Sequence, residues 1–270
     1  MIKSILILGF LMVLWSCHKN GISSSKRLTS VSLYATQAHS RDRQTDSILY
    51  DNNNRMIECR RMSFDTSLNS GGFITNVSSN QTSFVFSYIG PDTLPSSYLI
   101  RYSYSSNTPQ HILTYNNIKQ VINDSDVQQI TTVLLNSMYV SYAPNVIVAK
   151  IINPTGVSGI RIDSFILQNG NIISRYYKFP PQNSNNSVDQ ITYSTIPNPL
   201  YNFKSIGILL YEIFPNYFDY VSRNLFSNIS NSNNVGNTSM IWSVDADGNA
   251  ISGSGSASGS VAVQITFNYK

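Results

Sequence analysis

The sequence has few charged residues: aspartate, glutamate, lysine and arginine make up only 12% of its 270 residues, and the formal net charge is +4. The basic residues are dispersed along the chain and form no run. Because a nucleic-acid-binding surface needs a concentrated basic patch, we expect no nucleic acid among the partners of this protein.

Histidine and cysteine are scarce as well, with three and two copies. No His-x-x-x-His, Cys-x-x-Cys or Glu-plus-His grouping occurs, so we expect no metal site and no cofactor. The Gly-x-Ser-x-Gly turn of serine hydrolases is missing too. We therefore expect a protein that is not an enzyme and assign no catalytic residue, although a Ser-His-Asp assembly from distant segments stays open.

Only the N-terminus carries a sustained apolar run. Lys3 is followed by apolar residues from Ile5 to Trp15 and then by Ser16 and Cys17. The order of a basic residue, an apolar stretch and a small residue is that of an export signal, and the stretch is about half the roughly 20 residues of a membrane-spanning helix. We interpret residues 1–16 as a signal peptide, residues 17–27 as a tether and residues 28–270 as a single β-rich domain.

The Ser16-Cys17 pair resembles the lipobox of bacterial lipoproteins, which implies lipidation of Cys17 and a membrane as partner. An ordinary signal peptide with an incidental cysteine is the alternative. In the lipoproteins that this pair resembles, display at the cell surface usually goes with acidic residues just after the lipidated cysteine. The segment His18-Lys19-Asn20 contains no acidic residue. We expect an outer-membrane location that faces the periplasm and not the cell surface.

The second cysteine, Cys59, is then left without an intrachain partner. We place it on the same strand face as Ile57 and expect a small buried hydrophobe, with a reactive thiol as the alternative.

Alternation of apolar and polar residues predicts the fold class. Val261, Val263, Ile265, Phe267 and Tyr269 alternate with polar residues to the C-terminus, as in a half-buried antiparallel strand. The expected fold is all-β, a curved antiparallel meander or half-barrel of hairpins with little helix. Aromatic residues at alternate positions of two such strands are candidates to face a hydrophobic ligand: Phe84, Phe86, Tyr88, Tyr98, Tyr102 and Tyr104.

Short segments rich in Asn, Asp and Gly separate the strands. They run from Tyr50 to Ile57, from Leu167 to Ile173 and from Val244 to Ile251, with a fainter copy from Ile122 to Val127. Such residues accept the positive φ of a tight turn, so each segment predicts a hairpin. Calcium binding by Asp245 to Asn249 is the rival reading, but the distal glutamate of a calcium loop is missing.

Two stretches depart from the strand pattern. Val127 to Met138 shows helical spacing, but its Thr-Thr-Val run favours a strand. Tyr201 to Phe226 is dense in aromatic residues and contains Pro215, so we expect a long connection with a helical turn that closes one end of the core. Glu212 and Asp219 lie in it and are the only acidic residues outside predicted turns that suggest sugar binding or acid catalysis; exposed or capping roles are the competing reading.

Several of these pieces together resemble uncharacterised Bacteroidota lipoproteins with a β-rich domain of porin-like fold. The matching pieces are Ser16-Cys17, residues 50 to 55, Asn198 to Tyr201, Ser222 to Leu225 and Asp245 to Asn249. The resemblance implies a single curved antiparallel sheet and brings no catalytic residue. The hairpins also look like the tyrosine-aspartate repeats of large secreted toxins, but their irregular spacing argues against a repeat array.

These observations leave three classes of function open. The first is a lipid-anchored envelope protein that binds a hydrophobic small molecule or a glycan. The second is a structural or partner-binding envelope protein. The third, the alternative, is a hydrolase acting on envelope or dietary glycans. The strands of the domain are too short and interrupted for a transmembrane barrel, so we expect the sheet to stay in water.

Overall fold

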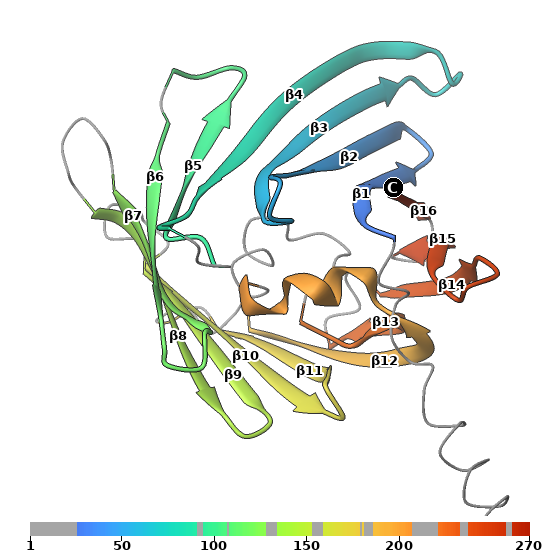
Figure 1. Cartoon of the computed structure of the whole chain (residues 1–270). Helices are drawn as coiled ribbons and strands as arrows, with labels where there is room; N and C mark the ends of the chain where they lie inside the picture. Colours follow the sequence, from blue (N-terminus) through green and yellow to red (C-terminus); the bar gives the residue numbers. More distant parts are fainter. Residues whose placement is uncertain are drawn as a thin grey trace, which may run out of the picture.

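The computed structural model describes residues 26–90, 94–106, 108–127, 134–152, 159–178, 180, 186–206, 221–232, 237–257 and 261–270. Sixteen strands and one 3-10 helix, η2, are present in these ranges (Figure 1). The strands are β1 (Leu28–Thr36), β2 (Ser40–Tyr50), β3 (Met56–Leu68), β4 (Ile74–Ser87), β5 (Ser97–Tyr102), β6 (Gln110–Tyr115), β7 (Val121–Val127), β8 (Leu134–Ala143), β9 (Val146–Ile152), β10 (Ile160–Gln168), β11 (Asn171–Lys178), β12 (Ser187–Pro197), β13 (Asn224–Asn231), β14 (Thr238–Val244), β15 (Ala250–Ala257) and β16 (Val261–Tyr269). The helix η2 (Pro199–Ile206) follows β12.

The strands form a closed antiparallel barrel in which each strand pairs with its neighbours in sequence. The first and last strands complete the ring, with Val31 opposite Phe267 and Leu33 opposite Ile265. The all-β prediction is confirmed, but the expected open meander or half-barrel is wrong, because β1 and β16 pair with each other and leave no free sheet edge. Figure 1 shows η2 inside the ring of strands.

The predicted C-terminal strand is confirmed: β16 pairs with both β15 and β1. Its face with Val263, Ile265 and Phe267 is buried, whereas Gln264 and Asn268 are exposed. The buried face is the inner wall of the barrel and the exposed face is the outer wall. Apolar residues inside and polar residues outside are the arrangement of a barrel with a packed core.

A repeated aromatic position organises the end of the barrel where the even-numbered strands finish. Six of these strands have a half-buried tyrosine at their end or within a few residues of it. The hydroxyl of each tyrosine donates a hydrogen bond to a backbone carbonyl at or near the start of the preceding strand. The donor–acceptor pairs, 2.7–3.0 Å apart, are Tyr50–Leu28, Tyr88–Met56, Tyr115–Pro95, Tyr142–Val121, Tyr193–Ile172 and Tyr269–Ala250. In β14, Trp242 donates its Nε1 hydrogen to the Phe226 carbonyl in the same way. We call this set the aromatic ring.

Two residues before each aromatic position, every even-numbered strand carries a buried apolar side chain. Of the even-numbered strands, only β10 has no aromatic residue at the aromatic position, which is occupied by Leu167. The buried positions are Ile48, Phe86, Leu113, Val140, Phe165, Ile191, Met240 and Phe267. These eight residues form a core layer beside the aromatic ring. All eight hairpin units contribute to the core layer, and seven of them contribute to the aromatic ring. The hairpins thus differ in length but reuse the same inner positions.

The predicted hairpin turns share one hydrogen-bond pattern. Asp51 Oδ1 accepts the backbone N–H groups of Asn53 and Arg55, and Asp245 Oδ1 accepts those of Asp247 and Asn249. The residue at the third place after each aspartate, Asn54 or Gly248, has positive φ. Residues 169 and 170 likewise have positive φ between β10 and β11. The three main hairpin predictions are thus confirmed, and local turn chemistry accounts for the Asp245 oxygens.

The fainter hairpin predicted at Ile122 to Val127 is wrong, because these residues lie inside β7 and the turn occurs earlier, at Asn116 to Gln120. The choice of strand over helix near Met138 is confirmed by β8, while residues 128–133 lie outside the described residues. The helical turn expected in the aromatic connection is present as η2. The rest of that connection, with Glu212 and Asp219, lies outside the described residues.

Cys59 is free and buried, as expected, but it does not share a face with Ile57, and that prediction is wrong. The β2–β3 register shifts between Leu49–Glu58 and Tyr50–Met56, so a bulge turns Ile57 outward. Burial raises the pKa of the Cys59 thiol well above its usual value. A buried neutral thiol of this kind acts as a core side chain.

Candidate functional site: the two walls of the barrel

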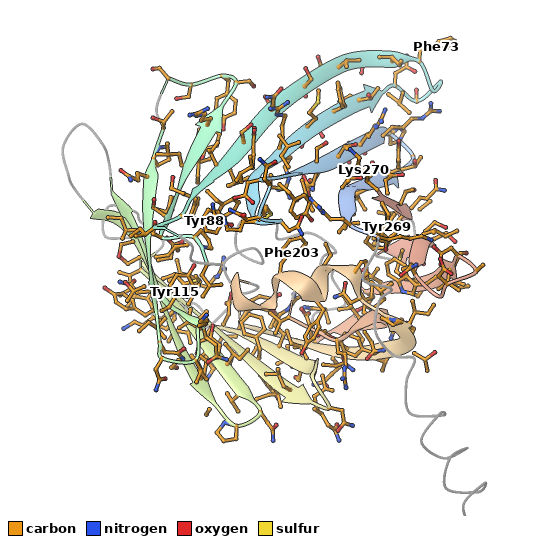
Figure 2. All side chains as sticks on the ribbon, viewed as in Figure 1. Phe73, Tyr88, Tyr115, Phe203, Tyr269 and Lys270 are labelled. Atoms are coloured by element: carbon orange, nitrogen blue, oxygen red, sulfur yellow. The ribbon has the colours of Figure 1, made fainter. Side chains whose placement is uncertain are left out.

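Most of the residues predicted to face a ligand lie on the inner wall. Phe84, Phe86 and Tyr98 are buried in the core, and the Phe86 and Tyr98 rings are 5.8 Å apart. Tyr102 also lies on this wall, opposite Thr82. Tyr88 belongs to the aromatic ring (Figure 2). The structure thus brings five of the six residues to one wall, and their role toward a ligand stays a prediction.

The sixth residue, Tyr104, follows the end of β5 and is 68% exposed. Its ring centroid is 5.3 Å from that of Tyr102. It therefore lies at the rim of the barrel opposite the aromatic ring, because β5 runs away from that ring.

The inner wall also carries acidic side chains. Most lie beyond the core layer, away from the aromatic ring, whereas Asp124 pairs directly with Leu113 of that layer. They are Asp42, Asp46, Asp65, Asp124, Asp163 and Asp189, each on the inner face by the strand register. Most have a cationic or hydrogen-bonding neighbour on the same wall, as buried charges require.

Two ion pairs join neighbouring strands on this wall. The Arg61 guanidinium binds Asp46 through Nε, 2.9 Å from Oδ1, and through Nη2, 3.1 Å from Oδ2. Arg175 binds Asp189 through Nε, 2.8 Å from Oδ2, and through Nη2, which donates to the same oxygen. In each pair the aspartate is almost fully buried, so these residues stabilise the barrel wall and are not free to bind a charged ligand.

A third cluster centres on the buried Asp124 carboxylate. Tyr98 donates its hydroxyl hydrogen to Oδ2 at 2.8 Å, and His111 Nδ1 lies 3.0 Å from Oδ1. The Tyr98 and His111 rings are stacked with centroids 4.3 Å apart. The cluster fixes three adjoining strands, β5, β6 and β7, through one carboxylate.

Near the rim, Asp42 and Asp65 face each other across β2 and β3. Partial burial and the charge of Asp65 raise the pKa of Asp42. No group of three or more metal-ligating residues occurs within the described ranges.

The outer wall has the opposite character. Residues that face outward on β13 to β16 and β1 are mostly serine, threonine, asparagine and glutamine, such as Ser254, Gln264 and Asn268. Outward charged residues are mainly basic: Arg41, Arg43, Arg60, Arg101, Lys150 and Lys178. Aspartates on the strands thus point inward while most cations point outward.

Strands β9 and β10 carry the most continuous apolar strip on the outer wall. Their outward residues include Val146, Val148, Ile160, Ile162 and Ile166. On other strands the exposed outward apolar residues are more scattered, such as Leu49 on β2, Met62 on β3 and Ile241 on β14. A transmembrane barrel needs an apolar outer band around its whole circumference, which the outward residues of β13 to β16 and β1 do not supply. Within the described ranges, no helix is long and apolar enough to cross a membrane.

The outer wall of β1 to β3 holds a pocket of about 330 Å³. Its lining comprises Tyr34, Ala35, Thr36, Arg41, Asp42, Arg43, Phe64 and Thr66. None of these residues was among the sequence candidates. The signal that was present is the Arg41-Asp42-Arg43 alternation, which in a strand puts two arginines on one face and the aspartate on the other.

Comparison with known proteins gives similarity in structure alone, since no protein-family profile and no curated protein sequence matches the chain. A porin-like protein from Bacteroides vulgatus aligns with a TM-score of 0.54 and 10% identity, over 91% of this chain and 99% of that chain. A porin-like protein from Bacteroides uniformis aligns with a TM-score of 0.46 and 9% identity, over 90% and 96% of the two chains.

The class defined by these observations is the all-β, porin-like barrel. The expected likeness to porin-like Bacteroides proteins is confirmed at the level of the fold by the Bacteroides vulgatus structure. An identity this low shows a shared fold and carries no function with it.

Proposed function

We propose that this chain is a non-catalytic binding protein of the bacterial envelope, held at the outer membrane by lipid on Cys17, with its barrel outside the bilayer. The periplasmic face is the proposed side, because no acidic signal follows Cys17. The porin-like fold of the Bacteroides vulgatus structure supports an envelope location.

The observation that carries the proposal is the polarity of the two walls. Inward positions next to the aromatic ring are apolar and buried, and most outward positions are hydroxyl, amide or cationic side chains. Moving arginine or lysine to the lipid face of a barrel at the bilayer midplane costs about 2–4 kcal/mol each. A barrel with this outer wall is more stable in water, so membrane attachment has to come from another part of the chain.

The start of the described chain fits an anchor at one end of the barrel. The Lys26 ammonium binds the carboxylates of Asp245 and Asp247, 2.9 and 2.8 Å away, in the turn between β14 and β15. Arg27 and Lys270 exchange backbone hydrogen bonds beside it. A tether that precedes Lys26 would therefore leave from the end with the aromatic ring, and the opposite rim would face away from the membrane.

The test uses the full chain expressed in a bacterial host with its own N-terminus. We expect wild type to incorporate labelled palmitate and to sediment with membranes. Cys17→Ala should incorporate none and should leave the membrane in alkaline carbonate as folded protein. Cys59→Ala is the matched control, because it removes the other cysteine and should leave both lipidation and sedimentation unchanged.

The opposite results overturn the proposal in different ways. A Cys17→Ala protein that resists carbonate extraction in a folded state would mean that the barrel itself lies in the bilayer. Wild type without incorporated lipid would mean that no acyl anchor exists. Wild type that carries palmitate and is cut by protease added to whole cells would keep the anchor but move the protein to the cell surface.

Binding is the proposed activity because the described residues offer a pocket without a reactive group. The pocket on β1 to β3 contains arginines, aromatic rings and threonines, but no histidine and no pair of carboxylates. The hydrolase alternative depended on Glu212 or Asp219, which lie outside the described residues, and nothing in the described chain supports it.

A further inference from the structure

Six outward side chains of β1, β2 and β3 form a regular grid around the outer pocket. The cross-strand register places Arg43 between Tyr34 and Phe64. One step nearer the rim, it places Arg41 between Thr36 and Thr66. Each arginine is therefore the middle of a row, flanked by two rings in one row and by two hydroxyls in the other.

The two arginines are available to a ligand. Both side chains are exposed, and neither forms an ion pair with an acidic residue in the described part of the chain. Asp42, the residue between them, lies on the inner wall. Two guanidinium groups two residues apart on one strand face thus present their planar donors to solvent.

The aromatic neighbours give the pocket a flat apolar surface. The Arg43 guanidinium carbon lies 5.2 Å from the centroid of the Tyr34 ring, which places the guanidinium over the ring face. Phe64 is half-buried on the other side of Arg43. A ring on each side of a cation suits a flat ligand that carries a negative group.

We infer that this pocket binds an anionic saccharide, meaning a chain of pyranose rings that bear carboxylates. Guanidinium groups bind carboxylates through paired hydrogen bonds, aromatic rings contact the apolar C–H faces of sugar rings, and the Thr36 and Thr66 hydroxyls match sugar hydroxyls. The volume of about 330 Å³ lies at the lower end of small-ligand sites, enough for one or two sugar rings with the rest of the chain in solvent.

The position of the pocket favours a saccharide over a membrane headgroup. Thr36 ends β1 and Arg41 lies at the start of β2, so the pocket is near the rim opposite the chain termini. Under the proposed anchoring that rim faces away from the membrane. The inference rests on the proposed function only for this orientation, since the pocket is complete within the barrel.

The experiment is calorimetric titration of the full-length protein in detergent, at low salt, with tetragalacturonate as the probe. Maltotetraose, which is neutral, and sodium acetate, which has the charge without the sugar, are the comparison ligands. We expect the acidic tetrasaccharide to bind measurably tighter than both. Arg43→Ala should weaken binding about tenfold, the effect of losing one charge-assisted pair, and Tyr34→Leu should weaken it several-fold while Tyr34→Phe retains it.

Arg101→Ala is the matched control because it removes an equally exposed outward cation from β5, away from the pocket. It should leave the affinity unchanged. Equal weakening by Arg101→Ala would show a general effect of positive charge and overturn the site. If acetate bound equally well, the site would not require a sugar. If maltotetraose bound equally well, the site would not require a negative charge. Either result would overturn the inference.

Binding to vesicles of anionic phospholipid that Arg43→Ala abolishes, without binding of the tetrasaccharide, would instead assign the pocket to the membrane surface. Each of these results is independent of lipidation at Cys17. Failure of the saccharide inference is therefore distinguishable from failure of the proposed anchor.

Discussion

The indole of Trp242 lies against the backbone of Gly253, directly across the β14–β15 ladder. A β carbon on Gly253 would stand 2.5 Å from Cζ3 of the indole ring, closer than real side chains approach. The indole is held there by the hydrogen bond from Nε1 to the Phe226 carbonyl and by the Phe226 ring, which packs edge-on against it. The glycine thus makes room for the one tryptophan in the aromatic ring.

We predict that Gly253→Ala destabilises the barrel by about 1–3 kcal/mol, the usual cost of overpacking a core. Chemical denaturation followed by circular dichroism measures the change in every variant, including one without the indole. Ser254→Ala, on the outward face of the same strand, is the control and should have little effect. Adding Trp242→Leu to Gly253→Ala should recover part of the loss, and if it recovers none, the indole is not what Gly253 accommodates.

Strand positions could be predicted from local alternation, but the closure of the barrel could not. The pattern in β16 identifies a half-buried strand whether its neighbour is β1 or solvent. Pairing of Val31 with Phe267 depends on the accumulated twist and stagger of all sixteen strands, which no local window contains. The bulge that separates Ile57 from Cys59 is hidden for the same reason, because it exists only in the register between two strands.

The outer pocket, too, could be predicted from the sequence only in part. Alternation alone puts Arg41 and Arg43 on one face of a strand. That their neighbours are Tyr34, Phe64 and threonines follows from the registers of β1 with β2 and of β2 with β3, which turn geometry sets and composition does not reveal. The aromatic ring was likewise missed, since its tyrosines belong to hairpins of different lengths.

The tyrosine hydroxyls of the aromatic ring should make the protein sensitive to alkali. Burial raises the pKa of Tyr88 and Tyr142 to about 12, and it raises the pKa of Tyr50, Tyr115 and Tyr269 as well. Between the ordinary tyrosine pKa of 10 and these values, the unfolded chain loses protons that the folded chain keeps. Stability therefore falls as pH rises through this window.

The measurement is a pH titration from 9 to 13 that follows circular dichroism and tyrosinate absorbance together. We expect ionisation of the buried tyrosines to coincide with unfolding. Tyr142→Phe, which loses one hydroxyl bond, should also cost about 1 kcal/mol at neutral pH, whereas Tyr139→Phe on the outer face should cost little. Complete tyrosine ionisation with the fold intact would contradict this account.

The ion pairs of two arginines on β3, Arg61 with Asp46 and Arg60 with Glu58, differ in burial and should differ in their contribution to stability. Asp46→Ala removes the buried carboxylate that the Arg61 guanidinium binds and should cost about 3–5 kcal/mol, as for other buried pairs that lose one member. Arg60, which pairs with Glu58 on the outer wall, is much more exposed. Arg60→Ala should therefore cost at most about 1 kcal/mol.

Urea denaturation of both variants gives the comparison directly. The double variant Asp46→Leu with Arg61→Met should recover much of the loss, because a packed apolar pair replaces the buried charges. Equal costs for the inner and the outer variant would mean that water reaches the inner pair freely, and the assignment of Asp46 to a packed wall would then be wrong.

The turn between β14 and β15 links the N-terminal segment to the barrel through a carboxylate that is ionised in the folded state. The Lys26 ammonium, together with the amide of Asn249, lowers the pKa of Asp245 far below its usual value. At a pH below about 4 the unfolded chain binds a proton at this position that the folded chain does not, so the stabilisation by the Lys26 pair is present at neutral pH and is lost as the pH falls.

Asp245→Asn keeps the side-chain oxygen that accepts the turn amides but loses the charge. Its melting temperature should lie below that of wild type at pH 7, and the difference should shrink steadily toward pH 2. Asp245→Ala loses the turn bonds as well, so its deficit should persist at low pH. A constant difference between wild type and Asp245→Asn across the titration would mean that the ammonium does not stabilise this turn, and that the chain before Leu28 is not fastened to the barrel at this point.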